Sequence, residues 1–333
     1  MVADVQRGRR GHHLRWPVAR LDGLASRVTR TTETVPAGLD GERIDRVVAL
    51  VTGLPRTAAA DLVASGAVEI GGRPVTTRSR RVTTGEVIDV DLPALAEPEP
   101  CEPDAEVDIA VVFADEHVIV CDKPAGLVTH PGAGNRRGTL VQGLLARFPD
   151  LAAVGDPARP GIVHRLDKGT SGLLVVARTR AAYASLTRQL ASRTAVREYL
   201  ALAWGHLDAS AGVIDAPVGR AERHRTRMAV SARGRVARTR YEVRTRFSSP
   251  VEVTLVSCRL ETGRTHQIRV HLAAVGHPVV GDTRYGGARR SLAPGRPFLH
   301  AERLSFDHPA TGERLVFESA LPAELAEVLA GLT

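Results

Sequence analysis

The stretch GIVHRLDKGTSGLLVVART, residues 161–179, decides how the rest of the chain is interpreted. Its apolar runs predict a buried strand up to Leu166, a tight polar turn, a second strand and the start of a helix. Asp167 stands at the exit of the first run, with Arg165 and Lys168 close on either side. A lone carboxylate there indicates either a turn residue that bonds its own backbone or a functional group.

The composition bounds the class of protein. The chain has 333 residues, 43% of them hydrophobic, which predicts a globular protein of two folded units. No apolar run approaches the roughly 18–20 residues that cross a bilayer, and the arginine-rich start lacks the apolar segment of a secretory signal. Cys101, Cys121 and Cys258 are far apart and form no C-x-x-C pair, which disfavours a disulfide framework and a zinc knuckle. We therefore expect a cytoplasmic protein without a membrane anchor.

The charge indicates a polyanionic partner. The formal net charge is +8, a balance that suits nucleic acid, although many basic soluble proteins bind none. Residues 108–333 carry 31 basic and 21 acidic residues, whereas residues 93–107 carry five acids and no base. The positive excess therefore belongs to the long C-terminal part.

The chain divides at a segment of distinct composition. Residues 93–107, PALAEPEPCEPDAEV, are rich in Pro and Glu without an apolar period, and predict an extended acidic linker. Residues 1–33 match no pattern and predict a basic disordered extension, with a phosphate-contacting arm as the alternative. Residues 108–325 alternate predicted strands and helices and form the second folded unit, followed by a C-terminal tail at 326–333.

The first folded unit, residues 34–92, is expected to be a small α+β domain. Two short amphipathic helices are predicted, the first by the helical spacing of its apolar residues and the second ending near Gly66. The alternating segment AVEIGGRPV predicts a hairpin that turns at Gly71 and Gly72.

This unit resembles the S4 RNA-binding module. The matching features are Gly41, Arg43, Asp45, Arg56, Thr57, Gly66, Val68 and the Gly71-Gly72 turn. The resemblance implies an RNA-binding face that contains Arg43, Arg46 and Arg56, with further arginines at 78–81. The unit departs from the module at Ala58, where a basic residue or serine is frequent, and the net charge of residues 41–92 is zero. A generic small α+β domain is therefore the alternative.

Four motifs of the second unit occur in a characteristic order. They are DKPAGLVTHPGAG at 122–134, HRLDKGTSG at 164–172, REY at 197–199, and LETGRTHQIRVH at 260–271 followed by GHPVVGD at 276–282. Together they resemble the RluA/RluD type of pseudouridine synthase, over about residues 34–325. The resemblance implies an α+β fold with a mixed, largely antiparallel sheet flanked by helices, plus the small S4-like domain. It also implies isomerisation of specific uridines in RNA, with large-subunit ribosomal RNA as the partner, and a monomer.

The resemblance implies a role for three residues. Asp167 matches the catalytic aspartate, which acts beside C1′ and C2′ of the ribose without a metal ion or cofactor. Tyr199 matches the active-site tyrosine, which packs against the extruded base, and Arg269 matches the basic partner. Because burial disfavours an ionised carboxylate, a fixed cation such as Arg269 should keep Asp167 charged and aimed. Covalent attack by the aspartate and removal of the C2′ proton both remain open.

Further residues are expected to contact RNA. Arg165 matches a position that meets the RNA where the base leaves the helix, and its side chain can fill that gap. On the same resemblance, RNA contacts are expected from His164, Lys168, Arg264, His266 and Gln267. Gly169 stands where the family often has a larger polar residue, which removes no group that the chemistry requires.

Other interpretations of these motifs are weaker. THQIRVHLAAVG at 265–276 predicts a helix with Thr265 as its N-cap and a buried stripe of Ile268, Leu272 and Val275. His266 and His271 do not share a face of that helix, which disfavours a metal site. GAGNRRG at 132–138 lacks the Gly-Lys-Ser/Thr ending of a phosphate-binding loop. A non-catalytic RNA-binding protein and a transfer-RNA synthase remain as alternative functions.

Overall fold

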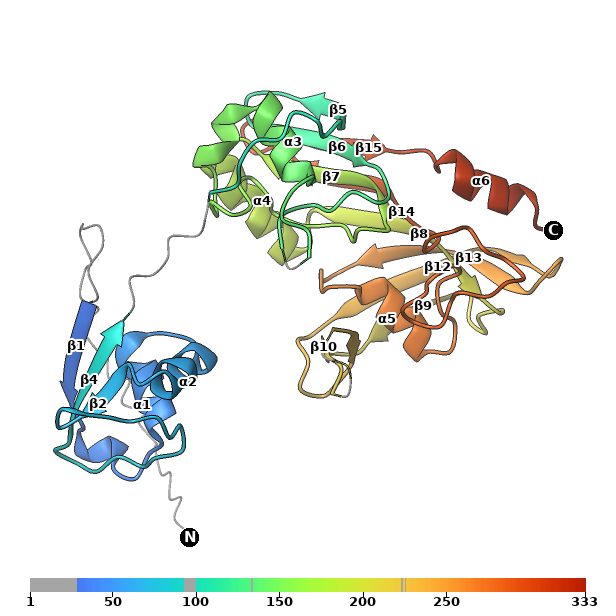
Figure 1. The fold of residues 1–333 in the computed structure, drawn as a ribbon. Coiled ribbons are helices and arrows are strands. Elements are labelled where there is room, and N and C mark those ends of the chain that lie inside the picture. The colour runs from blue at the N-terminus through green and yellow to red at the C-terminus, as the bar shows by residue number, and fades with distance from the viewer. Residues whose placement is uncertain (1–28, 93–99, 133, 223, 225) are drawn as a thin grey trace, which may run out of the picture. The chain divides into compact units, whose positions relative to one another are not determined.

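The computed structural model of the protein describes residues 29–92, 100–132, 134–222, 224 and 226–333. The chain forms two compact units, residues 1–97 and 98–333 (Figure 1). Each unit has its own buried apolar cluster. Most of the predicted N-terminal extension, residues 1–28, and the first part of the predicted linker, residues 93–99, lie outside the described residues.

The smaller unit is a four-stranded sheet with two α-helices and one short 3-10 helix. The sheet order is β1 (Thr29–Thr34), β4 (Val87–Leu92), β2 (Val68–Ile70) and β3 (Arg73–Pro74), and the helices are η1 (Ala37–Leu39), α1 (Ile44–Thr52) and α2 (Arg56–Ala64). Ile44, Val47 and Val48 of α1 are buried against the sheet, as their helical spacing predicts. The predicted hairpin is present, since β2 pairs with β3 across Gly71 and Gly72.

The predicted start of this unit at residue 34 is wrong. β1 begins at Thr29, where it pairs with Leu92 of β4. The segment TRTTET has no apolar alternation, so hydrophobic patterning could not reveal it. Its place in the sheet rests on backbone pairing and on Arg30, which forms ion pairs with Glu69 and Asp89 of the neighbouring strands.

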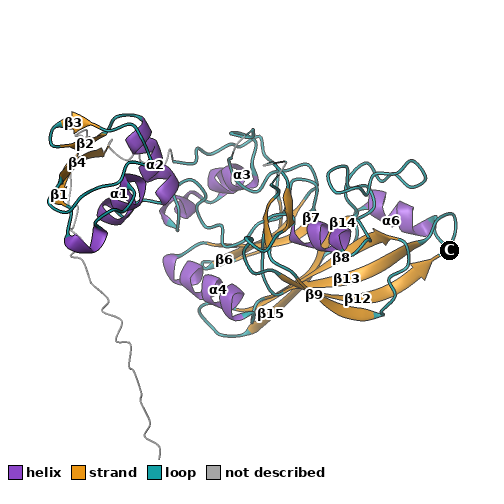
Figure 2. Cartoon of the chain, turned by 90° about the horizontal axis from the view of Figure 1, so that it is seen from below, coloured by secondary structure: helices purple, strands orange, loops and turns teal. Residues whose placement is uncertain are grey.

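The larger unit is built on a nine-stranded sheet (Figure 2). The strand order is β5 (Ala110–Ala114), β6 (Val118–Lys123), β7 (Ser171–Ala177), β14 (Leu299–Asp307), β8 (Val196–Trp204), β13 (Val253–Leu260), β12 (Arg238–Phe247) and β9 (Ala211–Asp215), and β15 (Arg314–Glu318) also pairs with β14. In this sheet β7 and β14 run parallel and the other paired strands run antiparallel. The prediction of a mixed, largely antiparallel sheet is confirmed.

Helices cover both faces of this sheet. They are α3 (Leu140–Arg147), η2 (Pro149–Ala153), α4 (Arg180–Ser192), α5 (Gln267–Ala274) and α6 (Ala323–Ala330), and a small ribbon is formed by β10 (Val218–Arg220) and β11 (Met228–Val230). Because side chains alternate along a strand, Ile119 and Cys121 of β6 join one cluster with α3 and α5. Val118 and Val120 join another cluster with α4.

The predicted strand before Asp167 is a loop. Residues 161–170 contain only an isolated bridge between Ile162 and Val176, and the first true strand of this stretch is β7. α4 follows with Thr179 as its N-cap. Leu166 is buried although its backbone is not in a strand. A short apolar run in a buried loop therefore resembles a strand in sequence.

Two predicted boundaries in the larger unit are also wrong. α6 spans residues 323–330, so the tail predicted from 326 is part of a helix whose Leu325 packs near Trp204 and Phe298. At the other end, residues 100–107 of the predicted linker attach to this unit, since the N–H groups of Cys101 and Asp104 donate to carbonyls of the larger unit. Backbone hydrogen bonds of this kind cannot be predicted from the amino-acid composition of a segment.

Among the described residues, no single helix is long and apolar enough to cross a membrane; α1 and α2 reach that length and composition only as a pair, across a bend of 117°.

Candidate active site

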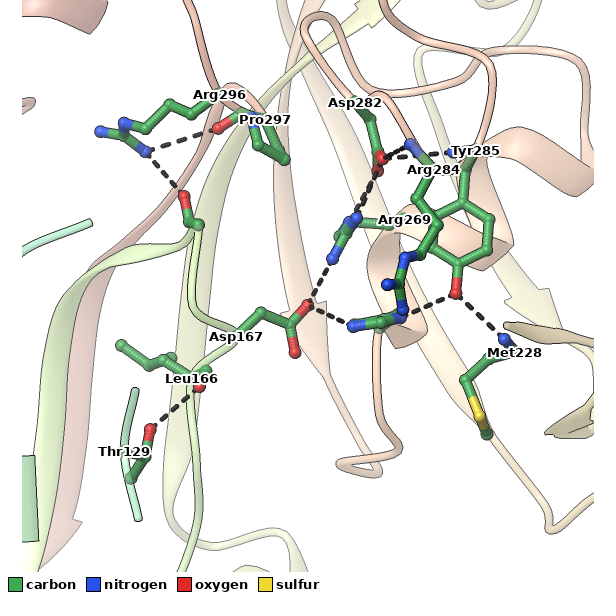
Figure 3. A network of polar contacts seen from close by, with 12 residues as sticks. Thr129, Leu166, Asp167, Met228, Arg269, Asp282, Arg284, Tyr285, Arg296 and Pro297 are labelled. Carbon is green, nitrogen blue, oxygen red and sulfur yellow. Dashed lines mark hydrogen bonds and ion pairs between the residues drawn. The ribbon is translucent and has the colours of Figure 1, made fainter. Parts of the chain in front are cut away.

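The loop of residues 161–170 fixes the backbone of Asp167 on both sides (Figure 3). Before it, the buried Leu166 anchors the chain in the core, and its carbonyl accepts a 2.9 Å hydrogen bond from the Thr129 hydroxyl. After it, the carbonyl of Asp167 accepts from the N–H of Thr170, and the carbonyl of Lys168 accepts from the N–H of Gly126. The backbone of Asp167 thus makes a turn while its side chain is free to point elsewhere.

The carboxylate of Asp167 points toward Arg269 on α5. Nη1 of Arg269 donates to Oδ2 of Asp167 at 3.1 Å, and Nε and Nη2 donate to the carboxylate of Asp282 at 2.6 and 2.9 Å. Asp282 is fully buried and also accepts from the N–H groups of Arg284 and Tyr285. Arg269 is therefore held by Asp282 with its remaining amino group directed at Asp167.

The charges of this cluster stabilise one another. Burial opposes the charged form of Arg269, but the hydrogen bonds and charges of Asp282 and Asp167 raise its pKa above the ordinary value. Burial likewise acts to raise the pKa of Asp282, and the Arg269 guanidinium outweighs it and holds that pKa below the usual range. The site therefore contains a permanent cation beside Asp167.

His266 lies on the other side of the Asp167 carboxylate. Its Nε2 is 4.0 Å from Oδ2 of Asp167, and its Nδ1 is 2.7 Å from the hydroxyl of Tyr285, which accepts from the N–H of Met228. If the tyrosine hydroxyl donates to Nδ1, the proton of a neutral His266 sits on Nε2, facing Asp167. Burial lowers the pKa of His266, although the charge of Asp167 opposes this, so the ring favours the neutral form.

Asp167 opens into a small cavity beside Tyr199. The cavity, about 40 Å³, is lined by Arg165, Leu166, Asp167, Thr170, Tyr199, Leu260, Arg264, His266, Gln267, Ile268 and Leu299. Tyr199 is 4% exposed, and its hydroxyl has no hydrogen-bond partner among the described residues. Burial raises the pKa of Tyr199, partly offset by the charge of Arg197. A larger hollow of about 270 Å³ beside α3 contains none of the predicted site residues.

Comparison with known proteins identifies the family. A family model described as RNA pseudouridylate synthase matches residues 117–274, and an S4 domain model matches residues 42–88. Ribosomal large subunit pseudouridine synthase D of Nitrosomonas europaea is 44% identical over 306 residues, which cover 89% of this chain and 86% of that protein. The chain belongs to the RNA pseudouridylate synthase family.

Other relatives agree with this assignment. The uncharacterized RNA pseudouridine synthase YlyB of Bacillus subtilis is 42% identical over 293 residues, covering 87% of this chain and 94% of that protein. The solved structure of human RNA pseudouridylate synthase domain containing 1 is 30% identical, covers 70% of this chain and 91% of that chain, and has a TM-score of 0.54. This chain is therefore an RNA-modifying isomerase with an S4 domain.

Two residues expected to contact RNA are used inside the synthase. The amide of Gln267 donates to the carbonyl of Arg238 and the hydroxyl of Thr239, while its oxygen accepts from Thr262 and from the N–H of Arg264. The side-chain amide of Gln267 is therefore fully used within the protein, while the residue also lines the cavity, and its contact with RNA stays a prediction.

His164 also makes its contact inside the synthase, and its contact with RNA stays a prediction. It is 9% exposed, and its Nε2 accepts from the N–H of Val175 on β7. The ring therefore anchors the Asp167 loop to the sheet. Sequence alone does not tell which side chains of a loop point inward.

The other expected RNA contacts of the larger unit lie around the cavity. Arg165 and Lys168 are exposed on either side of Asp167, and Arg264 lines the cavity while donating to the carbonyl of Val236. His266 lies beside Asp167, as described above. Neither His266 nor His271 belongs to a cluster of metal-binding side chains in the described part of the chain.

In the S4 domain, two of the expected arginines converge on a buried acid. Arg43 donates twice to Asp45, at 3.1 and 2.9 Å, and Arg56 donates to the same carboxylate at 3.4 Å. Arg46 is exposed and pairs with Glu42 at 2.7 Å. Asp45 therefore holds the side chains of Arg43 and Arg56 in position.

Sequence reasoning missed three residues of the site. Asp282 is the last residue of the motif at 276–282, and Tyr285 lies three residues after it. No role was predicted for either residue. Lys123 is fully buried, and its Nζ donates to the carbonyls of Pro124 and Leu127 at 2.8 and 2.9 Å. Burial lowers its pKa to about 7, against the charge of Asp167. In the sequence, the feature that could have indicated Lys123 and Asp282 is that each is a charged residue next to an apolar run.

Proposed function

We propose that this synthase converts specific uridines of large-subunit ribosomal RNA to pseudouridine, with Asp167 as the catalytic carboxylate. The observation that carries the proposal is the Asp167 carboxylate, held 3.1 Å from a buried arginine in a cavity that Tyr199 also lines. Support for the substrate comes from the similar proteins whose names specify the ribosomal large subunit.

In the proposed reaction, the target uridine leaves the RNA helix and enters the cavity. The bond between N1 and C1′ breaks, the base rotates, and C5 bonds to C1′; C5 then loses its proton and N1 gains one. Asp167 acts at the ribose, by attack on C1′ or by removal of the C2′ proton. Arg269 orients the carboxylate through its 3.1 Å hydrogen bond, and Tyr199 packs against the base. The exposed Arg165 fills the gap in the RNA and offsets part of the extrusion cost of a few kcal/mol.

Mapping of pseudouridine tests this proposal. Unmodified large-subunit rRNA transcripts are treated with the wild-type protein or with Asp167→Asn, which is nearly isosteric but cannot ionise. Conversion of one or a few uridines by the wild type alone is the expected result. Activity of Asp167→Asn within tenfold of wild type would refute the role of the aspartate. Conversion of transfer RNA but not rRNA would refute the substrate.

A further inference from the structure

Arg197 of β8 is buried without a counter-ion. The residue is 7% exposed, its Nε is buried with no hydrogen-bond partner, and the guanidinium makes no ion pair with any described residue. Buried arginines are ordinarily paired, because an isolated charge loses its hydration on burial. Of the described arginines that bear on the active site, Arg269 follows this rule and Arg197 does not.

Arg197 lies beside the cavity that contains Asp167. It is two residues from Tyr199 on the same strand, so both side chains project from the same face of the sheet. Leu260 and Arg264, which flank the turn opposite Arg197, both line that cavity. The unpaired guanidinium therefore adjoins the place where the substrate base is proposed to bind.

A glycine covers the guanidinium. Gly263 is exposed, and a Cβ atom added to it would lie 2.9 Å from Nη1 of Arg197 and 3.8 Å from its Cζ. The backbone at Gly263 does not need a glycine, since its φ lies outside the left-handed region. The absence of a side chain at this position therefore leaves Arg197 within reach of a group that approaches from outside.

The surroundings favour an anion over a neutral group. Three further arginines, Arg193, Arg238 and Arg240, converge on the single carboxylate of Glu261, two residues before Gly263. Asp215 is a second acid near Arg238, at 3.5 Å. Three guanidinium groups therefore share two carboxylates here, so the segments around Gly263 carry an excess of positive charge.

We propose that Arg197 binds a backbone phosphate of the RNA next to the nucleotide whose base enters the cavity. The inference rests on the proposed function, because RNA supplies the phosphate. A guanidinium matches a phosphate with two parallel hydrogen bonds, and the pairing supplies the counter-ion that Arg197 lacks in the free protein. Arg197 is thus a substrate-binding residue that stays uncompensated until RNA arrives.

The free protein gives the first test. Arg197→Met removes the charge and keeps an aliphatic side chain of similar length. Because the charge has no partner in the free protein, we expect the melting temperature of Arg197→Met to be equal to or higher than that of wild type. A purely structural arginine would give the opposite result, a clear fall in melting temperature.

Binding to a large-subunit rRNA transcript over a range of salt concentrations gives the second test. Arg197→Met should weaken binding by about tenfold, and the slope of log affinity against log salt should shrink by about 0.7–0.9, the value of one phosphate contact. Arg197→Lys should retain the slope. Gly263→Ala should weaken RNA binding when it is introduced into the wild-type protein. It should have little further effect when it is introduced into Arg197→Met. Arg314→Gln, an exposed arginine on β15, is the matched control.

The outcomes separate this inference from the proposed function. Unchanged affinity and salt slope in Arg197→Met would overturn the phosphate site, as would lower turnover with an unchanged slope, which indicates contact with the base. Both results leave the proposed function intact if the wild type still converts the same transcript. Failure of the wild type to bind and convert rRNA would overturn both.

Discussion

Arg269 is shared between two carboxylates that differ in burial. Asp282 is fully buried and takes two of its hydrogen bonds, whereas Asp167 is partly exposed to the cavity and takes one. Removing the guanidinium therefore affects the fold and the reaction together. We expect Arg269→Ala to lower the stability by about 3–5 kcal/mol, because Asp282 is left as an unpaired buried charge. Turnover should fall by about two orders of magnitude or more.

Arg269→Lys should give an intermediate case in both stability and turnover. A lysine keeps the positive charge but cannot reach both carboxylates with a planar fork. Urea unfolding and single-turnover conversion should place this variant between wild type and Arg269→Ala. Wild-type turnover in Arg269→Ala would show that the contact with Asp167 has no part in the reaction.

Tyr285 sets the orientation of His266. Its hydroxyl lies between the N–H of Met228 and Nδ1 of His266, which directs the other ring nitrogen toward Asp167. Tyr285→Phe removes that hydroxyl and keeps the ring over Arg269, at 5.1 Å from its Cζ in the wild type. We expect about tenfold slower turnover with unchanged RNA affinity, and nitrogen NMR should show His266 as a mixture of tautomers. A single Nε2–H tautomer in the variant would refute this role.

At the scale of elements, the parallel junction of β7 and β14 depends on a glycine. Gly172 has φ of +110°, and a Cβ atom there would lie 2.3 Å from the carbonyl oxygen of Ala301. Gly172→Ala should therefore cost about 2–4 kcal/mol in stability, from overpacking and backbone strain together. Gly276→Ala is the control, because φ is +91° there with no atom within 4 Å. Equal losses in urea unfolding would mean that the close approach to Ala301 is unimportant.

The loop that carries Asp167 should weaken in acid. Burial lowers the pKa of His164 to about 3, and its Nε2 must stay unprotonated to accept from Val175. Between pH 3 and 6.5 the unfolded chain binds a proton that the folded chain does not. This contribution to stability is complete above pH 6.5 and is lost as the pH falls, by up to about 1.4 kcal/mol per pH unit.

Urea unfolding between pH 4 and 7 measures this effect. His164→Gln can still accept from Val175 but does not titrate, so its stability should depend less steeply on pH. A residual slope is expected from His130, whose pKa burial lowers to about 4. Identical slopes in wild type and variant would contradict the assignment to His164.

The same elements show what sequence can predict. Apolar spacing and turn residues were sufficient for α1 and the Gly71-Gly72 hairpin, because local patterns determine them. The N-terminus of α5 was placed one residue too early, at Thr265, since His266 caps it in the left-handed conformation with φ of 57°. Val275 was assigned to the buried stripe of that helix and is 46% exposed. Long-range contacts decide such details.

In the candidate site too, local motifs could be predicted from the sequence and long-range contacts could not. Asp167, Tyr199 and Arg269 were predicted from motifs, and the structure gathers Asp167 and Tyr199 around one cavity with Arg269 bonded to Asp167. Asp282 and Tyr285 were not predicted to act there. Their contribution arises from hydrogen bonds to residues 13 to 57 positions away. No local period encodes a bond of that kind.

At the scale of the whole molecule, the two units have separate cores. The buried cluster of the S4 domain lies within residues 35–92, and the described clusters of the larger unit lie within residues 101–332. We therefore expect a fragment that starts at residue 98 to fold and to melt cooperatively. Its melting temperature should match one of two transitions seen by calorimetry in the full chain. A fragment without a cooperative transition would show that its core depends on the first 97 residues.

The same fragment tests what the S4 domain contributes to the reaction. The residues of the active site all remain, so the intrinsic chemistry should persist, while RNA affinity should fall and the choice of uridine should broaden. In the full chain, Arg46→Gln combined with Arg56→Gln should reproduce part of that loss, because both arginines are exposed and Arg43 still pairs with the buried Asp45. Pseudouridine mapping on large-subunit rRNA is the measurement. Unchanged affinity and site choice in the fragment would assign substrate selection to the larger unit, where the positive charge is concentrated.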